Sequence, residues 1–373
     1  MPWSVAPLRL GRAWPAAADA ATLRARWAAV TAAGAAERER LFRPSRLRTP
    51  EGGAAALPGQ RVRTGRFAQE PGECPEPVRV VSGPFHEEWL LPDQRLIDAA
   101  RPELWRVRDA HQLFLLEGDV EPLVTAHLPA GPQGRVRPLH RRPGGAEPNV
   151  APGLLDFLGG LYRTWVTPED VLSWVLAAGR PGPRGYEVPL ATDPETWRAG
   201  LELGHRILTV QLRGARGGEP PRLPGGRRPY VRAAVPARPD GLSYDPGTET
   251  LHLGSGQISP VPAEAWEYEV RGVRVVEGWF AARTAYRDAD GLEALGPAEW
   301  PQEWTSELLG LLTTLSLLAE LAPARAAFTV SPALPAADLR QAGVLPPPRW
   351  SRRPASVLDH QEEGPGGQFA LPL

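Results

Sequence analysis

The sequence predicts an α/β (α+β) fold with a mixed, mainly antiparallel sheet that contains hairpins and is flanked by helices. Strand–turn–strand patterns at 242–253 and 266–275 predict the hairpins. Helix starts at Thr167 and Asp193, each followed by apolar residues at helical spacing, predict the flanking helices. With 373 residues, 42% of them hydrophobic, the chain can bury a substantial core.

The N-terminal part alternates between ordered segments and segments rich in Pro and Gly. Residues 19–42 predict a helix that Asp19 can cap. Residues 44–77 predict a loop or linker because Pro, Gly and Arg dominate there. Short apolar runs between turns at 78–117 predict strands, and an arginine-containing loop follows at 131–148.

Three helices are predicted in the middle of the chain. Pro152 opens the first, and Asp193 opens the third. The second has the clearest start, because Thr167 suits the N-cap, Pro168 the first helical position and Asp170 the third.

The segment 242–287 carries the strongest strand signals. The turn at 245–248 has Pro in its second position and Gly in its third, which suits a type II turn. A second strand pair is predicted at 266–275, with Trp266, Tyr268 and Val270 on one face, and it leads into a helix through Trp279 and Arg283. A long apolar helix then runs to about Leu321.

The chain divides into a helical segment at 1–60, a main domain at 61–335 and a Pro/Gly-rich tail at 336–373. We expect the tail to be disordered, because few apolar groups are available to pack it. The apolar run at 308–321 is shorter than the ~20 residues that cross a bilayer, which predicts a core helix and no membrane association. No signal peptide is evident.

Composition excludes several kinds of chemistry. All 42 basic residues are arginine, so no lysine can form a Schiff base or bind phosphate in a P-loop. Cys74 is the single cysteine, which excludes an internal disulfide and a cysteine-based zinc site and favours the reducing cytoplasm. The formal net charge is −1, so any surface for nucleic acid must be a local patch.

No complete catalytic motif is present. The sequence lacks G-x-x-x-x-G-K-[ST], G-x-S-x-G and H-E-x-x-H, and no G-x-G-x-x-G joins a strand to a helix. Paired acids such as Glu87 and Glu88 are typical of solvated surfaces. We therefore expect a non-enzymatic chain without a metal or cofactor.

Arginine and tryptophan leave two interpretations open. The guanidinium groups of arginines in loops can recognise phosphates and guanine edges. Alternatively, these arginines form the solvated face of a lysine-free protein. The chain has 13 tryptophans, which can stack on bases, but Trp197, Trp279 and Trp304 lie in helical segments where core packing is the ordinary role.

A series of motifs resembles one family, the C-terminal specificity region of type ISP restriction-modification enzymes, in which helicase-nuclease and adenine-methyltransferase parts precede a target recognition domain. The resemblance covers roughly 20–335, and its motifs occur in the family's order. They are LRARWAAV and RERLFRPSRLRT, PFHEEWLLPDQRLIDAARPELWRV, GRVRPLHRRPGGAEPNVAPGLLDFL, VTPEDVLSWVLAA, YEVPLATDPETWRAGLELGHRIL, the hairpin from LSYDPGTETLHLG to EGWFAARTAY, and WTSELLGLLTTLSLL.

The resemblance implies that 61–335 is a target recognition domain that reads a short asymmetric site in double-stranded DNA from the major groove. It places Arg135 and Arg137 in the family's arginine loop, Asn149 just after it and Arg283 in its W-x-x-x-R element. Arginine suits bidentate contact with guanine, and asparagine suits adenine. These four residues are the predicted DNA contacts.

The sequence departs from full-length members of that family, because it lacks the methyltransferase N-P-P-Y motif and every helicase and nuclease motif. We therefore expect a non-catalytic recognition module that acts with, or derives from, a methyltransferase or nuclease chain. The rival interpretations are a protein-interaction scaffold that kept the fold but lost DNA binding, and an enzyme of unrecognised type. A positive cleft that contains Arg135, Arg137 and Arg283 distinguishes recognition from scaffolding; pairing of those arginines with Glu87 and Glu88 argues against recognition.

Overall fold

The computed structural model describes residues 1–60, 65–117, 121–131, 134–182, 185–225, 227–270 and 272–355. Helices are mixed with mainly antiparallel strands, which confirms the predicted fold class. The helices are α1 Ala20–Ala32, α2 Ala35–Phe42, α3 Pro102–Arg106, α4 Leu154–Tyr162, α5 Pro168–Ala178, α6 Pro194–Leu212, α7 Ala263–Trp266, α8 Val275–Thr284, α9 Gln302–Ala327 and α10 Ala336–Gln341. The strands are β1 Ala16–Ala17, β2 Val78–Gly83, β3 His86–Leu90, β4 Phe114–Glu117, β5 Leu123–Thr125, β6 Leu128–Pro129, β7 Arg135–Pro138, β8 Arg180–Gly182, β9 Gly185–Glu187, β10 Tyr230–Ala233, β11 Leu242–Asp245, β12 Thr250–Leu253, β13 Gly256–Ser259, β14 Glu269–Val270 and β15 Val273–Arg274.

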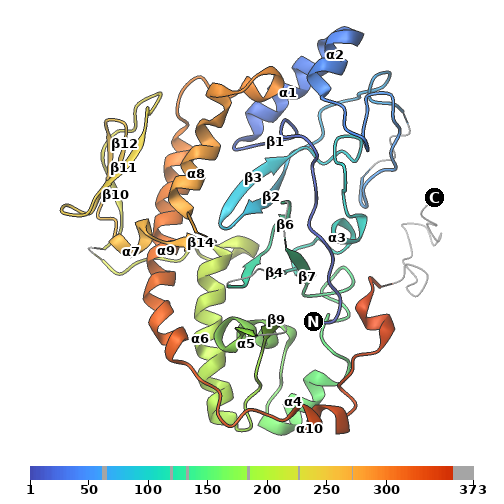
Figure 1. Cartoon of the computed structure of the whole chain (residues 1–373), viewed down its shortest axis with the longest axis vertical. Helices are drawn as coiled ribbons and strands as arrows, with labels where there is room; N and C mark the ends of the chain where they lie inside the picture. Colours follow the sequence, from blue (N-terminus) through green and yellow to red (C-terminus); the bar gives the residue numbers. More distant parts are fainter. Residues whose placement is uncertain are drawn as a thin grey trace.

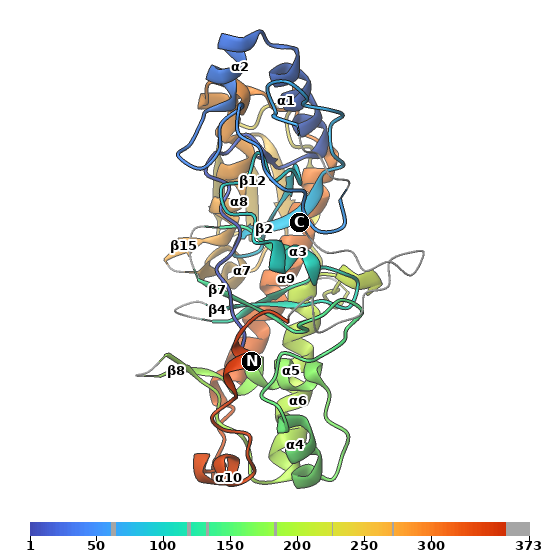
Figure 2. The same cartoon turned by 90° about the vertical axis from the view of Figure 1, so that its right-hand side faces the viewer.

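The molecule is elongated, with α1 and α2 at one end and α4 and α10 at the other (Figures 1 and 2). Two sheets lie between these ends. One has the order β1-β3-β2-β6 and is antiparallel except between β2 and β6, and the other has the antiparallel order β5-β4-β7. Fully buried side chains from both sheets, including Val80, Phe114 and Val136, share one apolar cluster. Strand β7 is therefore backed by a packed core.

Helices α5, α6 and α9 form the main helical layer. Helix α5 approaches α6 closely because Gly204 has no side chain: a Cβ there would lie 2.0 Å from the Ser173 carbonyl oxygen. Among the described residues, α9 is long and apolar enough to cross a membrane by length and composition. Half of that apolar stretch is buried inside the protein, with Leu308 and Leu311 fully covered, so α9 serves as a core helix.

The predicted helix starts are confirmed by their hydrogen bonds. Thr167 Oγ1 accepts the Asp170 N–H at 3.0 Å, and Asp170 Oδ2 accepts the Thr167 N–H at 2.8 Å, which completes a capping box. Asp193 and Asp19 each accept the backbone N–H three residues later, at 2.8 and 2.7 Å. The single helix predicted over 19–42 is wrong, because residues 33–34 are extended and separate α1 from α2.

The segment 242–287 contains the predicted hairpin but only part of the second strand pair. Strand β11 pairs with β12, from Leu242 opposite Leu253 to Asp245 opposite Thr250, within a sheet of order β10-β13-β12-β11. Trp266 was predicted in a strand, but it ends helix α7. Its ring stacks on Tyr244, with 5.5 Å between ring centroids, and this long-range contact outweighs the local alternation.

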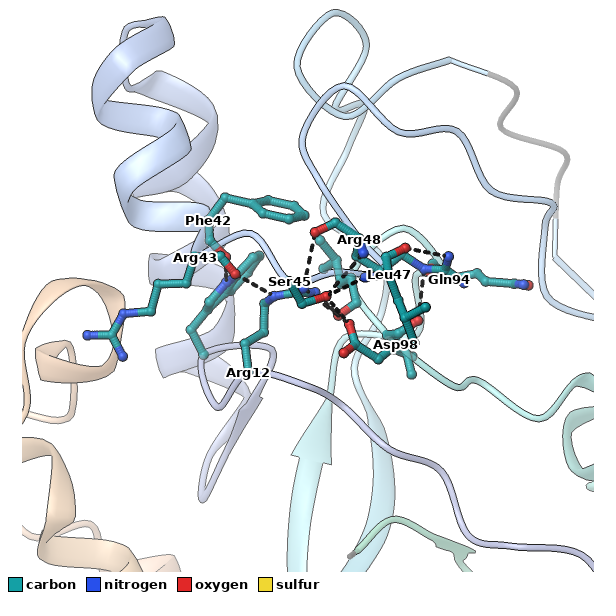
Figure 3. A network of polar contacts seen from close by, with 11 residues as sticks. Arg12, Phe42, Arg43, Ser45, Leu47, Arg48, Gln94 and Asp98 are labelled. Atoms are coloured by element: carbon teal, nitrogen blue, oxygen red, sulfur yellow. Dashed lines mark hydrogen bonds and ion pairs between the residues drawn. The ribbon is translucent and has the colours of Figure 1, made fainter.

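The predicted N-terminal segment, 1–60, is built into the rest of the protein. The Val5 N–H donates to the Val136 carbonyl at 2.9 Å, which places the N-terminal strand-like segment along β7. Arg12 then links three segments (Figure 3): its guanidinium donates to the Arg43 carbonyl at 3.1 Å and pairs with Asp98 at 3.2 Å. Residues 1–60 therefore contact the described parts of the main domain, and the boundary at residue 60 stays a prediction.

The tail predicted at 336–373 is ordered as far as the structure describes it. Residues 336–355 include α10 and a turn of 3₁₀ helix at Arg349–Arg352. Arg141 Nη2 holds this segment by donating to the Trp350 carbonyl at 3.0 Å and the Arg353 carbonyl at 2.8 Å. Residues 356–373 of the predicted tail lie outside the described residues.

Candidate functional site

Strand β7 brings two of the four predicted contact residues together. Arg135 and Arg137 are two positions apart on the strand, so they share a face, while Val136 between them points into the core. Arg135 is exposed at the start of the strand. Its Nε donates to Ser4 Oγ at 2.7 Å and its Nη2 donates to the Ser4 carbonyl at 3.1 Å. These contacts orient the guanidinium without neutralising its charge.

Arg137 is half-buried and pairs with an acid. Its Nε and Nη2 both contact Glu117 Oε2, at 2.9 and 2.8 Å, and its Nη1 donates to the Met1 carbonyl. Glu117 lies on β4, the antiparallel neighbour of β7. The charge of Arg137 is therefore largely balanced within the protein, and Arg135 is the more available of the two.

Asn149 does not reach the surface. Its Oδ1 accepts the Trp3 N–H at 2.9 Å, and its Nδ2 donates to the Trp3 carbonyl at 2.8 Å and the Pro138 carbonyl at 2.7 Å. The side chain is fully buried. Its hydrogen bonds satisfy backbone groups that would otherwise be unpaired in the interior, and they link the N-terminal segment to the end of β7. Because the side chain is buried, it is not available to contact a base.

Arg283 is also a core residue. Its guanidinium lies 3.7 Å from the ring centroid of Trp279 and 5.8 Å from that of Trp304, and its Nη2 is 2.6 Å from Glu307 Oε2. Burial lowers the pKa of Arg283 to about 10, although Glu307 opposes this shift, so the group stays charged at neutral pH. Arg79 on β2 pairs with the same carboxylate. The ion pair between Arg283 and Glu307 thus links α8 to α9.

The predicted cleft of Arg135, Arg137 and Arg283 is therefore not formed. None of the four predicted residues forms an ion pair with Glu87 or Glu88, although Glu88 is near enough to Arg283 to oppose the lowering of the Arg283 pKa. Glu87 instead contacts Arg213 at 3.4 Å and His127 at 3.9 Å, and Glu88 contacts His86 at 2.7 Å. The two acids are thus held by other partners and do not oppose the β7 arginines.

A cavity of about 620 Å³ opens beside Arg135. Apolar residues such as Phe85 and Leu318 form much of its wall. Arg325 also lines the cavity; it pairs with Glu121 and donates to the Leu176 carbonyl at 2.7 Å. Within the described ranges, no group of three or more His, Cys, Asp or Glu side chains is placed to hold a metal ion.

Comparison with known families decides the relationship that the motifs indicated. The sequence matches the family described as the type ISP C-terminal specificity domain over residues 1–311. The chain belongs to this family. The match confirms the resemblance found in the sequence and includes the N-terminal segment as well. A comparison with curated proteins finds no match.

Solved structures similar to this specificity domain include DrdV in complex with DNA, at 15% identity and a TM-score of 0.55, over 87% of this chain and 35% of the DrdV chain. Others are a nuclease-deletion mutant of the type ISP enzyme LlaGI with a DNA substrate mimic (15% identity, TM-score 0.47, 70% of this chain and 26% of that one) and the ATP-dependent type ISP enzyme LlaBIII bound to DNA (14%, 0.47, 69% and 19%). The DrdV likeness shows a shared fold, and the specificity domain spans about a third of that longer chain, 35%.

The specificity domain also has exposed arginines that the sequence patterns did not single out. The segment 213–240 showed only Arg, Gly and Pro with little periodicity. An available signal was the absence of any Asp or Glu between 222 and 238, where five arginines occur. All five are exposed: Arg222, Arg227, Arg228, Arg232 and Arg238.

Proposed function

We propose that this chain recognises a target sequence in double-stranded DNA as the specificity part of a restriction-modification system for phage defence, working in the cytoplasm. The observation that carries the proposal is the family match over 1–311. The fold shared with DrdV, which was solved in complex with DNA, supports it.

Arg135 is the proposed contact to DNA from β7. It is exposed, and it projects from a strand that a packed core holds in place. Its Nη1 stays available for a phosphate or for one acceptor of a guanine edge, because the contacts with Ser4 use Nε and Nη2. Arg137 is the second candidate. Its guanidinium group would have to contact DNA while it also contacts Glu117.

The chain itself supplies recognition in this proposal, while methylation and cleavage belong to a methyltransferase or nuclease chain that acts with it. The family is a specificity domain, and the sequence carries none of the methyltransferase, helicase or nuclease motifs. We therefore propose that the chain is not an enzyme on its own and needs no cofactor for binding.

Binding of the chain to a randomised pool of duplexes, followed by sequencing of the bound fraction, tests the proposal. Recognition predicts an enriched sequence and an affinity that falls steeply with salt, because each neutralised phosphate adds about −0.9 to the logarithmic slope. Arg135→Gln should lower affinity. A phosphate contact would flatten the slope by about 1, whereas a base contact would relax the preference at one position. Arg198→Gln, at an exposed position on α6, is the matched control.

A protein-interaction scaffold is the second candidate function. The observation that favours it is that Asn149 and Arg283 are buried and Arg137 is paired. Absence of duplex binding at low salt, for a chain that is shown to be folded, would favour the scaffold over recognition.

A further inference from the structure

Of the five arginines at 222–238, Arg232 lies on β10, an edge strand of the small sheet β10-β13-β12-β11, and the others lie in the segments just before and after that strand. The sheet order separates charges that are close in sequence. Strand β10 occupies one edge with the arginines around it, and β11, followed by the turn that contains Glu249, occupies the other edge with Asp245. The sheet thus has a positive edge and a negative edge, although the two strands are consecutive along the chain.

Side chains on both faces of strand β10 are exposed to solvent. Val231 pairs with Ile258 across the ladder, yet Ile258 is fully buried while Val231 is 42% exposed. Tyr230, on the opposite face, is 46% exposed. In the described part of the chain, β10 has β13 as its sheet neighbour and no strand on its other side. Both faces and the outer edge of the strand are therefore open to a partner.

Arg232 is held in position on this strand. Its guanidinium lies 5.6 Å from the Tyr230 ring centroid, and its Nε donates to Ser259 Oγ at 3.1 Å. Neither Arg232 nor Arg228 pairs with an acid among the described residues, and Arg222 has only an exposed contact of 3.7 Å with Glu219. Three guanidinium groups thus keep their charge available to an anionic partner.

The other two arginines anchor the edge to the protein. Arg227 pairs with Glu320 on α9, and Arg238 Nε donates to the Ala298 carbonyl at 3.5 Å. Leu223 is buried and fixes the start of the segment. In the view of Figure 1, this sheet lies on the opposite side of α9 from β7, so it is a surface separate from the Arg135 contact.

We propose that Arg222, Arg228 and Arg232, here called the basic edge, bind the phosphate backbone of duplex DNA without reading its sequence. The inference rests on the proposed function. A cluster of exposed guanidinium groups whose one acid contact is the solvent-exposed pair of Arg222 with Glu219 attracts a polyanion, and guanidinium groups bind phosphate oxygens with matched geometry. Phosphate contacts fix the register of a protein on the duplex and carry no direct sequence information. The negative edge of the same sheet faces away from this contact.

The test is the triple variant Arg222→Gln, Arg228→Gln and Arg232→Gln in the full chain, measured against salt by fluorescence anisotropy with the selected duplex. The matched control replaces the exposed arginines Arg163, Arg198 and Arg206 by Gln, so the net charge changes equally. We expect the salt slope of the edge variant to flatten by about 2 to 3 and its low-salt affinity to fall about tenfold or more, with its sequence preference unchanged.

The outcomes separate this inference from the proposed function. If the unmodified chain binds no duplex, both fail. If it binds and the edge variant keeps the slope and affinity of the control, the basic edge is not a DNA contact, and recognition still stands. A changed sequence preference would show that the edge reads bases. Self-association of the edge variant in gel filtration, with unaltered DNA binding, would assign the charges to protection of an open strand edge.

Discussion

Replacement of Glu307 by glutamine is expected to destabilise the fold strongly. Glu307 Oε2 lies 2.6 Å from Arg283 Nη2, and its other oxygen pairs with Arg79. The Arg283 side chain is 1% exposed, so water cannot replace a lost counter-charge. Burial opposes ionisation of Glu307, but Arg283 and Arg79 outweigh it and lower the pKa of the carboxyl. Glutamine would leave Arg283 charged in the core without its principal counter-charge, since Glu88 acts on it more weakly.

The expected size of this effect follows from the burial of the pair. Loss of one partner of a buried ion pair costs about 3–5 kcal/mol in unfolding free energy. Unfolding entropy is about 2.1 cal/mol/K per residue, so for this chain of 373 residues the loss corresponds to about 4–6 °C in Tm.

Urea unfolding and differential scanning calorimetry measure the change. Glu303→Gln, at an exposed position on the same helix, is the control and should cost less than about 1 kcal/mol. The double variant Glu307→Met, Arg283→Met should be more stable than Glu307→Gln, because apolar replacement of a whole buried pair is often neutral or stabilising. A loss below about 1 kcal/mol for Glu307→Gln would refute the view that Arg283 depends on this carboxylate.

Three further predictions concern stability. Gly204→Ala would place a Cβ 2.0 Å from the Ser173 carbonyl oxygen, so we expect a loss of about 1–3 kcal/mol in urea unfolding; unchanged stability would show that α5 and α6 separate easily. Asn149→Ala leaves both Trp3 backbone groups unpaired and should cost about 1–3 kcal/mol by the same assay; a cost near zero would contradict their burial. The pKa of Glu307 is lower in the folded state than its ordinary value of 4.5, so its stabilisation is complete above 4.5 and is lost as pH falls through the folded-state pKa; acid titration of stability should show a smaller loss in Glu307→Gln than in the unmodified chain.

The candidate site was predictable only in part from the sequence. Residue type identified Arg135 and Arg137, and their alternation on one strand placed them on a common face. Residue type did not reveal that Asn149 is buried, because its partner Trp3 lies 146 positions away along the chain. Residue type also did not reveal that Arg283 is buried, because its burial depends on the packing of α8 against Glu307 and Trp304 on α9.

The helix start at Thr167 and the hairpin at 242–253 are predictable from sequence alone, as are the absence of lysine chemistry and the family. Caps and tight turns depend on hydrogen bonds between residues a few positions apart, so their signals are local. Two other features become visible only in the folded protein: Trp266 ends a helix, and β10 and β11 lie at opposite edges of one sheet. Burial and strand order depend on contacts between distant segments, and it is the strand order that places the acids near β11 on the edge opposite the arginines.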